Sequence, residues 1–234
     1  MKAKVIQNHL RSLADPEVAE KSQRFFKTGK GDYGEGDRFL GIRVPILRAQ
    51  VTQYGELSLI EIGRLLKSNF HEERHFALML LVRQFSKRDA VQRKAIYEFY
   101  LDNTRYINNW DLVDCSAPGI VGVYLEGNSR RLLYALAEST SLWERRIAII
   151  STLHFIKKDD FADTLKISAL LLNDGEDLIH KAVGWMLREV GNRDFSVEEK
   201  FLKKNYRDMP RTMLRYAIEK FPGEMRKSYL DGSA

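Results

Sequence analysis

The segment YINNWDLVDCSAPGIVG, residues 106–122, brings together Trp110, Asp111, Asp114 and the only cysteine of the chain, Cys115. Trp110 and Asp114 are four residues apart, so on a helix their side chains share one face. A buried carboxylate without a partner is unstable. We therefore expect Asp114 to have either a structural partner or a chemical role. Cys115 lies about 100° further round the helix, and we expect it to be a buried free thiol.

A second group of this kind lies in IHKAVGWMLREV, residues 179–190. Lys181, Trp185 and Arg188 stand at positions i, i+4 and i+7 of one helical face. A tryptophan between two cations suits a surface that stacks on a sugar, a base or another cation better than it suits a dry core. Trp185 is therefore a candidate site residue, with packing in the core as the alternative.

HEERH, residues 71–75, matches the pattern in which two histidines bind zinc and the first glutamate, Glu72, is the general base. Glu98 is the available third ligand in this interpretation. The pattern is short, and Ser68 or Asn69 just upstream has the character of an N-cap. We therefore expect HEERH to be the surface start of an ordinary helix, and we expect no metal.

The segment GKGDYGEGD, residues 29–37, contains the glycine spacing of a dinucleotide-binding turn. A charged helical segment precedes it instead of a buried strand, and its three acidic residues would repel a phosphate. We expect a flexible loop over residues 28–38 and no cofactor.

The elements that must position these residues are helices. Apolar residues recur three and four apart almost everywhere, and strand-like alternation is nearly absent. Five amphipathic segments separated by short polar breaks illustrate the pattern: residues 58–68, 73–86, 93–102, 130–140 and 163–173. The sequence predicts an all-α fold built from helical hairpins.

An internal repeat extends this prediction. A basic or potentially basic residue precedes an apolar and then a small residue at four positions: His75, Arg146, Lys181 and Arg215. The last three are 35 and 34 residues apart, and the first gap of 71 residues is about twice as long, so a missing copy falls near residue 110 or 111. Stacked two-helix units of this length form an α-solenoid with a concave surface. We expect the last three of these residues to form a basic track there, with Trp110 and Asp114 set into it. Ordinary solvated helix ends are the alternative.

Composition narrows the class of protein. The 234 residues are 44% hydrophobic, which suffices for the core of one large domain or of two small ones, and we expect a single domain over residues 1–234. The apolar runs are too short to span a membrane, no signal peptide is visible, and one cysteine cannot form an internal disulfide, so we expect a cytoplasmic protein. A net charge of +6 is compatible with a polyanionic partner.

Four motifs together resemble the AlkD-type DNA alkylation repair enzymes, which are HEAT-like-repeat DNA glycosylases. They are NNWDLVDCSAPGIVG, LWERRIAIISTL, IHKAVGWMLREVG and FLGIRVP, and the resemblance runs from about Phe39 to Phe221. It implies an α-solenoid of HEAT-like repeats that wraps duplex DNA in its concave cleft. It also implies hydrolysis of the N-glycosidic bond of cationic alkylpurines such as N7-methylguanine and N3-methyladenine, by a monomer that needs no cofactor.

The resemblance also implies roles for individual residues. The catalytic aspartate falls on Asp114, the cleft tryptophans fall on Trp110 and Trp185, and the arginine that grips the DNA backbone falls on Arg146, with Arg145 as its alternate. The remaining residues that we expect to contact DNA are Lys181, Arg188, Arg215 and Arg43. Two features depart from the family pattern: the loop over residues 28–38 is longer and richer in glycine, and Phe25 stands where the best-known members have a tyrosine.

Two other functions fit the same sequence. The solenoid can be a binding module that holds DNA or a protein without catalysis. A carboxylate in a basic track weakens phosphate binding, so Asp114 argues for the enzyme. A zinc metallopeptidase built on HEERH is the second alternative.

Overall fold

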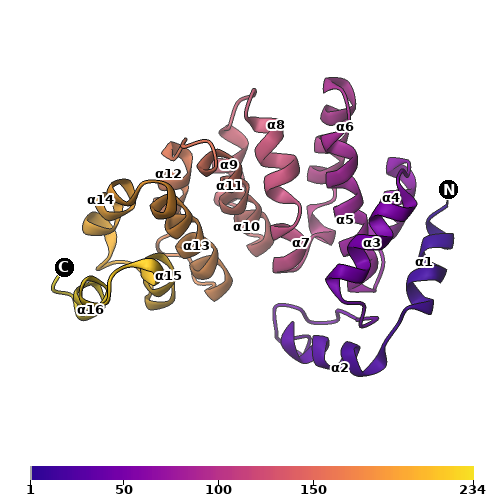
Figure 1. Ribbon diagram of the computed structural model, residues 1–234, viewed down its shortest axis with the longest axis horizontal. Helices are drawn as coiled ribbons and strands as arrows, with labels where there is room; N and C mark the ends of the chain where they lie inside the picture. The colour runs from indigo at the N-terminus through magenta and orange to yellow at the C-terminus, as the bar shows by residue number, and fades with distance from the viewer. Residues whose placement is uncertain (1) are drawn as a thin grey trace. The chain divides into compact units, whose positions relative to one another are not determined.

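The computed structural model describes residues 2–234, which form helices joined by loops (Figure 1). Within this range the only β-type pairing is an isolated bridge between Arg38 and Phe70, so the all-α prediction is confirmed. None of the helices in the described range is long and apolar enough to cross a membrane. The chain forms two compact units, unit 1 over Met1–Ser116 and unit 2 over Ala117–Ala234. The single domain over residues 1–234 stays a prediction.

Unit 1 contains the candidate residues of the first motif. Its helices are α1 (Ala3–Ser12), α2 (Pro16–Phe25), α3 (Val44–Tyr54), α4 (Leu59–Leu66), α5 (His71–Ser86), α6 (Ala90–Asp102), the 3-10 turn η1 (Thr104–Tyr106) and α7 (Trp110–Asp114).

Unit 2 contains the candidate residues of the second motif. Its helices are the π-helical turn η2 (Pro118–Gly122), α8 (Val123–Leu125), α9 (Arg131–Ala137), α10 (Leu142–Ser151), α11 (Leu153–Ile156), α12 (Ala162–Leu170), α13 (Asp177–Arg193), α14 (Phe195–Asn205), α15 (Arg211–Ala217), the 3-10 turn η3 (Ile218–Lys220) and α16 (Gly223–Asp231).

Helix α5 is the centre of unit 1 and packs against α3, α4, α6 and α7. Phe76, Leu80 and Phe85 are buried along its length. The first turn is buried as well, although all five residues of HEERH are polar. The expected surface start is therefore wrong. The cap was wrong too: the N-cap is Phe70, and Ser68 Oγ instead accepts the N–H of Phe70 at 3.0 Å.

The loop between α2 and α3 covers this first turn. The carboxylate of Glu72 accepts the backbone N–H groups of Leu40, Gly41 and Ile42 at 2.8, 2.7 and 3.2 Å. Gly41 has a φ of +83°, and a Cβ there would lie 2.1 Å from the carbonyl oxygen of Asp15, so only glycine fits. The segment directly after the predicted loop is thus fastened to α5, and the flexibility of the loop over residues 28–38 stays a prediction.

Helix α13 is the corresponding centre of unit 2 and packs against α10, α14 and α15. Val183, Met186 and Leu187 are fully buried, whereas Lys181, Trp185 and Arg188 are partly exposed. The expected helical face that carries a tryptophan between two cations is therefore confirmed.

The predicted repeat reappears as a common position within five helices. The fifth residues of α5, α7, α10, α13 and α15 are His75, Asp114, Arg146, Lys181 and Arg215. The missing copy was expected near residue 110 or 111, at half of the 71-residue gap between His75 and Arg146, but it lies at residue 114. The two halves of the gap are unequal, because α7 begins 39 residues after the start of α5 and 32 residues before the start of α10. The aspartate at 114 occupies the place that basic residues hold in the other helices.

Candidate active site

Helix α7 holds the first motif in place through its two buried residues and its ends. Leu112 and Val113 are fully buried in unit 1. At the start, the side-chain oxygen of Asn109 accepts the N–H of Trp110 at 2.8 Å. At the end, Ser116 Oγ donates to the carbonyl oxygen of Leu112 at 2.6 Å. With this face anchored, Trp110 and Asp114 on the other side are only half-buried.

Trp110 and Asp114 line the same open hollow of about 470 Å³, as their spacing predicted. The other lining residues are Phe25, Phe26, Val44, Arg48, His75, Asp111 and Cys115. The aromatic wall of the hollow is formed by Phe26, which stacks on Trp110 with ring centres 5.3 Å apart, and by Phe25, which meets Trp110 edge-on at 6.0 Å. Phe25 is 66% exposed, so its ring faces solvent without being needed for the core.

Cys115 was expected to be buried on the packed side of the helix, and it is not fully buried. It is half-buried and lines the same hollow, because α7 ends at Asp114 and Cys115 is already its C-cap. Burial, reinforced by the carboxylates of Asp111 and Asp114, raises the pKa of the Cys115 thiol well above its ordinary value. The residue stays a free thiol, as expected, and is unsuited to act as a thiolate nucleophile.

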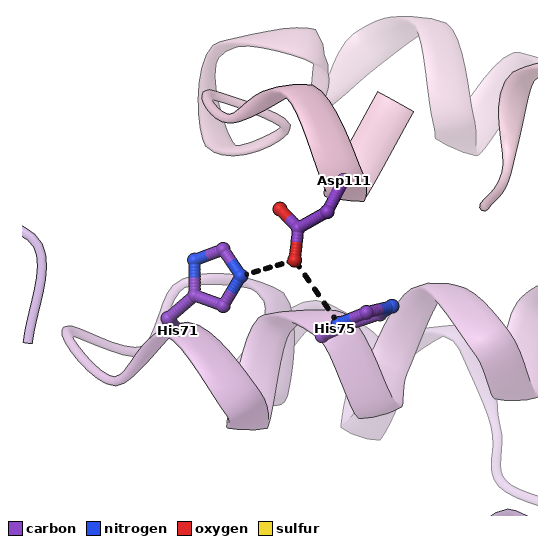
Figure 2. Close-up of side chains that lie close together, drawn as sticks. All are labelled: His71, His75 and Asp111. Atoms are coloured by element: carbon purple, nitrogen blue, oxygen red, sulfur yellow. Dashed lines mark hydrogen bonds and ion pairs between the residues drawn. The ribbon is translucent and has the colours of Figure 1, made fainter. Parts of the chain in front are cut away.

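Asp111 belongs to an ion cluster that sequence reasoning missed. In Figure 2 one of its carboxylate oxygens points between the rings of His71 and His75. His71 Nε2 donates to Asp111 Oδ2 at 2.7 Å, and His71 Nδ1 donates to Asp37 Oδ2 at 3.2 Å. Arg74 in turn donates to Asp37 Oδ1 at 2.5 Å. The cluster thus links α7 through α5 to the loop after α2.

The charges in this cluster follow from burial and pairing. Burial lowers the pKa of His71, but the carboxylates of Asp111 and Asp37 outweigh it and raise this pKa to about 9. Burial raises the pKa of Asp111, and the pairing with His71 more than reverses that shift. Burial lowers the pKa of His75 to about 4, although Asp111 acts in the opposite direction. At neutral pH His71 is therefore a cation and His75 is neutral.

The other residues of the metallopeptidase interpretation lie elsewhere. Both carboxylate oxygens of Glu72 accept backbone N–H groups of the segment after the loop, so Glu72 is not available as a general base. Glu98 pairs with Lys94 on the surface of α6, with 3.6 Å between Nζ and Oε1. Only His71 and His75 join a group that offers metal ligands, and the third member is Asp111: one atom from each side chain lies within 4.8 Å of the others.

The expected DNA-contacting residues of unit 2 lie in several environments. Arg146 is buried, and its Nη1 donates to the carbonyl oxygen of Leu178 at 2.6 Å. Its alternate, Arg145, is held by the carboxylate of Asp174 at 2.6 and 3.3 Å. Arg215 is exposed.

The cations beside Trp185 are both paired with acids. Lys181 lies 2.7 Å from Asp177, and Arg188 pairs with Glu219. Trp185 itself is half-buried and donates from Nε1 to Glu189 at 2.9 Å.

In unit 1, Arg43 is exposed at the N-cap of α3. Arg48 is exposed on the same helix and lines the hollow with Asp114, although no motif in the sequence pointed to it. The one feature of the sequence that could have indicated Arg48 is its position about one helical turn after the motif FLGIRVP. The functional roles of all these residues stay predictions.

Comparisons with known proteins agree with this architecture. A model of the DNA alkylation repair enzyme family matches residues 6–221. A search of curated proteins found no match. The fold is similar to that of a solved structure described as a predicted DNA alkylation repair enzyme from Enterococcus faecalis, with a TM-score of 0.69 and 18% identity over 90% of this chain and 97% of the other. The family model covers nearly the whole chain, so the protein belongs to the family of DNA alkylation repair enzymes.

Proposed function

We propose that the protein is a monofunctional DNA glycosylase of base-excision repair that releases cationic alkylated purines, N7-methylguanine and N3-methyladenine, from duplex DNA. The observation that carries the proposal is the open hollow, which Asp114 shares with Trp110 in a chain of this family. We further propose that it acts as a cytoplasmic monomer without a cofactor.

Asp114 is the proposed catalytic residue. Alkylation at N7 or N3 makes the purine cationic, so it leaves as a neutral base and needs no general acid. As the bond to C1′ stretches, positive charge develops on the deoxyribose. Water then adds at C1′ and loses a proton. A fixed carboxylate in a partly desolvated hollow stabilises that charge, and such preorganised groups are worth on the order of 3 kcal/mol, or about a hundredfold in rate.

The aromatic wall supports a cationic substrate. The rings of Trp110 and Phe25 line the hollow beside Phe26, and an aromatic face that no neighbouring ring covers attracts cations. Phe25 adds an exposed ring at the place where the resemblance implies a tyrosine. These rings favour a positively charged nucleotide over an unmodified one.

The contacts to the DNA backbone are proposed for the basic residues. Arg146 can act as a rigid donor, because a guanidinium has five N–H groups and the Leu178 carbonyl fixes its orientation. We assign weaker phosphate contacts to Arg43, Lys181, Arg188 and Arg215, and contact with the nucleotide's sugar to Trp185. Phosphate contacts of this kind position the DNA and carry no sequence specificity.

Single-turnover release of N7-methylguanine from methylated duplex DNA tests the proposal. The experiment compares the wild type with Asp114→Asn, with a chelator present. Asp102→Asn is the matched control, because Asp102 is an exposed carboxylate of the same unit outside the hollow. We expect a loss of about a hundredfold in Asp114→Asn with DNA affinity retained, and no loss in Asp102→Asn.

The alternative of a non-catalytic binding module predicts a different pattern. The wild type would then bind DNA in a salt-dependent way and release no base. Asp114→Asn would bind as well or better, because a negative charge has been removed from a phosphate-binding surface. That result would overturn the proposed activity.

A further inference from the structure

We propose that His71, His75 and Asp111 form a zinc site at the junction of α5 and α7. The proposal concerns metal binding alone: the ion is not a cofactor of the proposed glycosylase reaction, and the site does not rest on that activity. It differs from the metallopeptidase interpretation, because the glutamate of HEERH takes no part and the third ligand comes from the aspartate of α7.

The ligand geometry is close to what a tetrahedral ion requires. His71 and His75 are one turn apart on α5, so both rings project from the same face toward α7 (Figure 2). Zinc bonds of about 2.0–2.2 Å place neighbouring ligand atoms about 3.3 Å apart. Asp111 Oδ2 lies 3.4 Å from His75 Nδ1 and 2.7 Å from His71 Nε2, and the three ligand atoms fall within 4.8 Å of one another. The ion takes the place of the proton on His71 Nε2, which is released to solvent on binding, and small rotations of the side chains bring the three atoms to the ion.

The surroundings of His71 resemble the outer shell of a metal site. A zinc-bound histidine nearly always uses its other ring nitrogen as a donor to a carboxylate or carbonyl, which fixes the ring. Asp37 is placed for this role, 3.2 Å from His71 Nδ1. Arg74 and Asn109 both donate to Asp37 and hold it in position. His71 Nε2 therefore stays directed at Asp111.

The contact between His75 and Asp111 leaves room for an ion. Asp111 Oδ2 lies 3.4 Å from His75 Nδ1, which is longer than a good hydrogen bond. The same distance is close to the separation of two ligand atoms on one zinc ion. An ion bound to both atoms would replace this loose contact with two short bonds.

The donor set selects the class of metal. Two imidazoles and one carboxylate suit zinc and its late transition-metal neighbours, whereas Mg²⁺ and Ca²⁺ prefer oxygen ligands only. His75 and Asp111 line the hollow, so the fourth position of the ion is open to water from that side. The ion would join α5 to the helix that carries Asp114.

Metal titration of the untagged full-length protein, first stripped with EDTA, tests the site. Isothermal titration with ZnCl₂ is expected to show one zinc per chain. Co²⁺ replaces zinc as a spectroscopic probe, and we expect the intense visible absorption of a tetrahedral complex. His75→Asn and Asp111→Asn are expected to weaken zinc binding by at least about tenfold, since even outer-shell changes cost 10–100-fold. His9→Asn is the matched control, because His9 belongs to the same unit and contacts Gln50 instead.

A measurement on the wild type guards against variants that do not fold. In the Co²⁺ form, hyperfine-shifted imidazole N–H signals in the NMR spectrum count the histidine ligands directly, and we expect two. Folded wild-type protein that binds less than one zinc, or a Co²⁺ spectrum without histidine ligands, would overturn the site. Equal affinity in folded variants and the wild type would do the same. None of these readouts involves DNA, so failure here is distinct from failure of the proposed activity.

Discussion

Because Glu198 is buried without a hydrogen-bond partner for its Oε1 in the described part of the chain, we expect the free energy of unfolding of unit 2 to fall as the pH rises toward 8. Its side chain, on α14, is 2% exposed and packs against Gly191 of α13, where a Cβ would lie 1.6 Å from Glu198 Oε2. Its Oε1 has no hydrogen-bond partner in the described part of the chain. Burial raises the pKa of Glu198 from 4.5 to about 8, although Arg188 acts in the opposite direction. At neutral pH the folded protein therefore holds this carboxyl protonated.

The sign of the effect follows from linkage. Between pH 4.5 and about 8 the folded state keeps a proton that the unfolded state releases, so stability falls as the pH rises through this window. Below the window the penalty is absent, and above it the penalty is constant. The two pKa values correspond to a cost of about 1 kcal/mol at pH 5 and about 3 kcal/mol at pH 7. Glu198→Gln removes this cost while it keeps the shape of the side chain.

Urea unfolding of the wild type and Glu198→Gln at pH 5, 7 and 8 measures the prediction. The quantity to compare is the free energy of unfolding of Glu198→Gln minus that of the wild type. Any packing cost of glutamine is independent of pH, so the growth of this quantity from pH 5 to pH 7 reports the carboxyl alone, and we expect about 2 kcal/mol. Glu199→Gln is the control on the same helix, because Glu199 pairs with Lys203 at 3.0 Å and is partly exposed. A difference between Glu198→Gln and the wild type that is the same at pH 5 and pH 8 would refute the assignment.

Two further predictions concern unit 1. Gly41→Ala should lower the free energy of unfolding by more than about 2 kcal/mol, because it combines a positive φ with a clash against the carbonyl of Asp15. Gly36→Ala, at nearly the same φ of +81° but with open space around it, should cost only about 1 kcal/mol in the same urea titration, and equal costs would contradict the clash. Phe25→Ala should reduce the rate of base release several-fold while it changes stability by less than about 0.5 kcal/mol, since the ring is exposed. Ile60→Ala, equally exposed outside the hollow, should change neither, and unaltered release by Phe25→Ala would remove that residue from the site.

The fold was predictable from sequence because helical periodicity is a local property. Spacing alone placed Trp110 with Asp114, and Lys181 with Trp185 and Arg188, and the structure confirms both groupings. The repeat of basic residues was also visible, since each copy recurs at the fifth position of its helix.

What the sequence did not reveal depends on contacts between distant segments. HEERH has the polarity of a surface turn, and it is buried because distant segments pack on it. A loop more than thirty residues upstream docks on Glu72, and α1 contacts Glu73. Asp111 finds His71 forty residues away, a distance at which no spacing rule applies. The burial of Arg146 likewise depends on the Leu178 carbonyl of a later helix.

The first turn of α5 therefore controls the proposed active site without forming it. Glu72 fixes the loop that follows Phe25 and Phe26, and His71 fixes Asp111 on α7. The ring of His71 also lies against Phe26, with ring centres 5.0 Å apart, and Phe26 stacks on Trp110. The aromatic wall of the hollow and its two aspartates, Asp111 and Asp114, are thus positioned by His71 and Glu72, which are adjacent in one helical turn. Because these contacts are buried and charged, a substitution that removes one partner leaves the other unsatisfied, and the cost extends to the placement of Asp114.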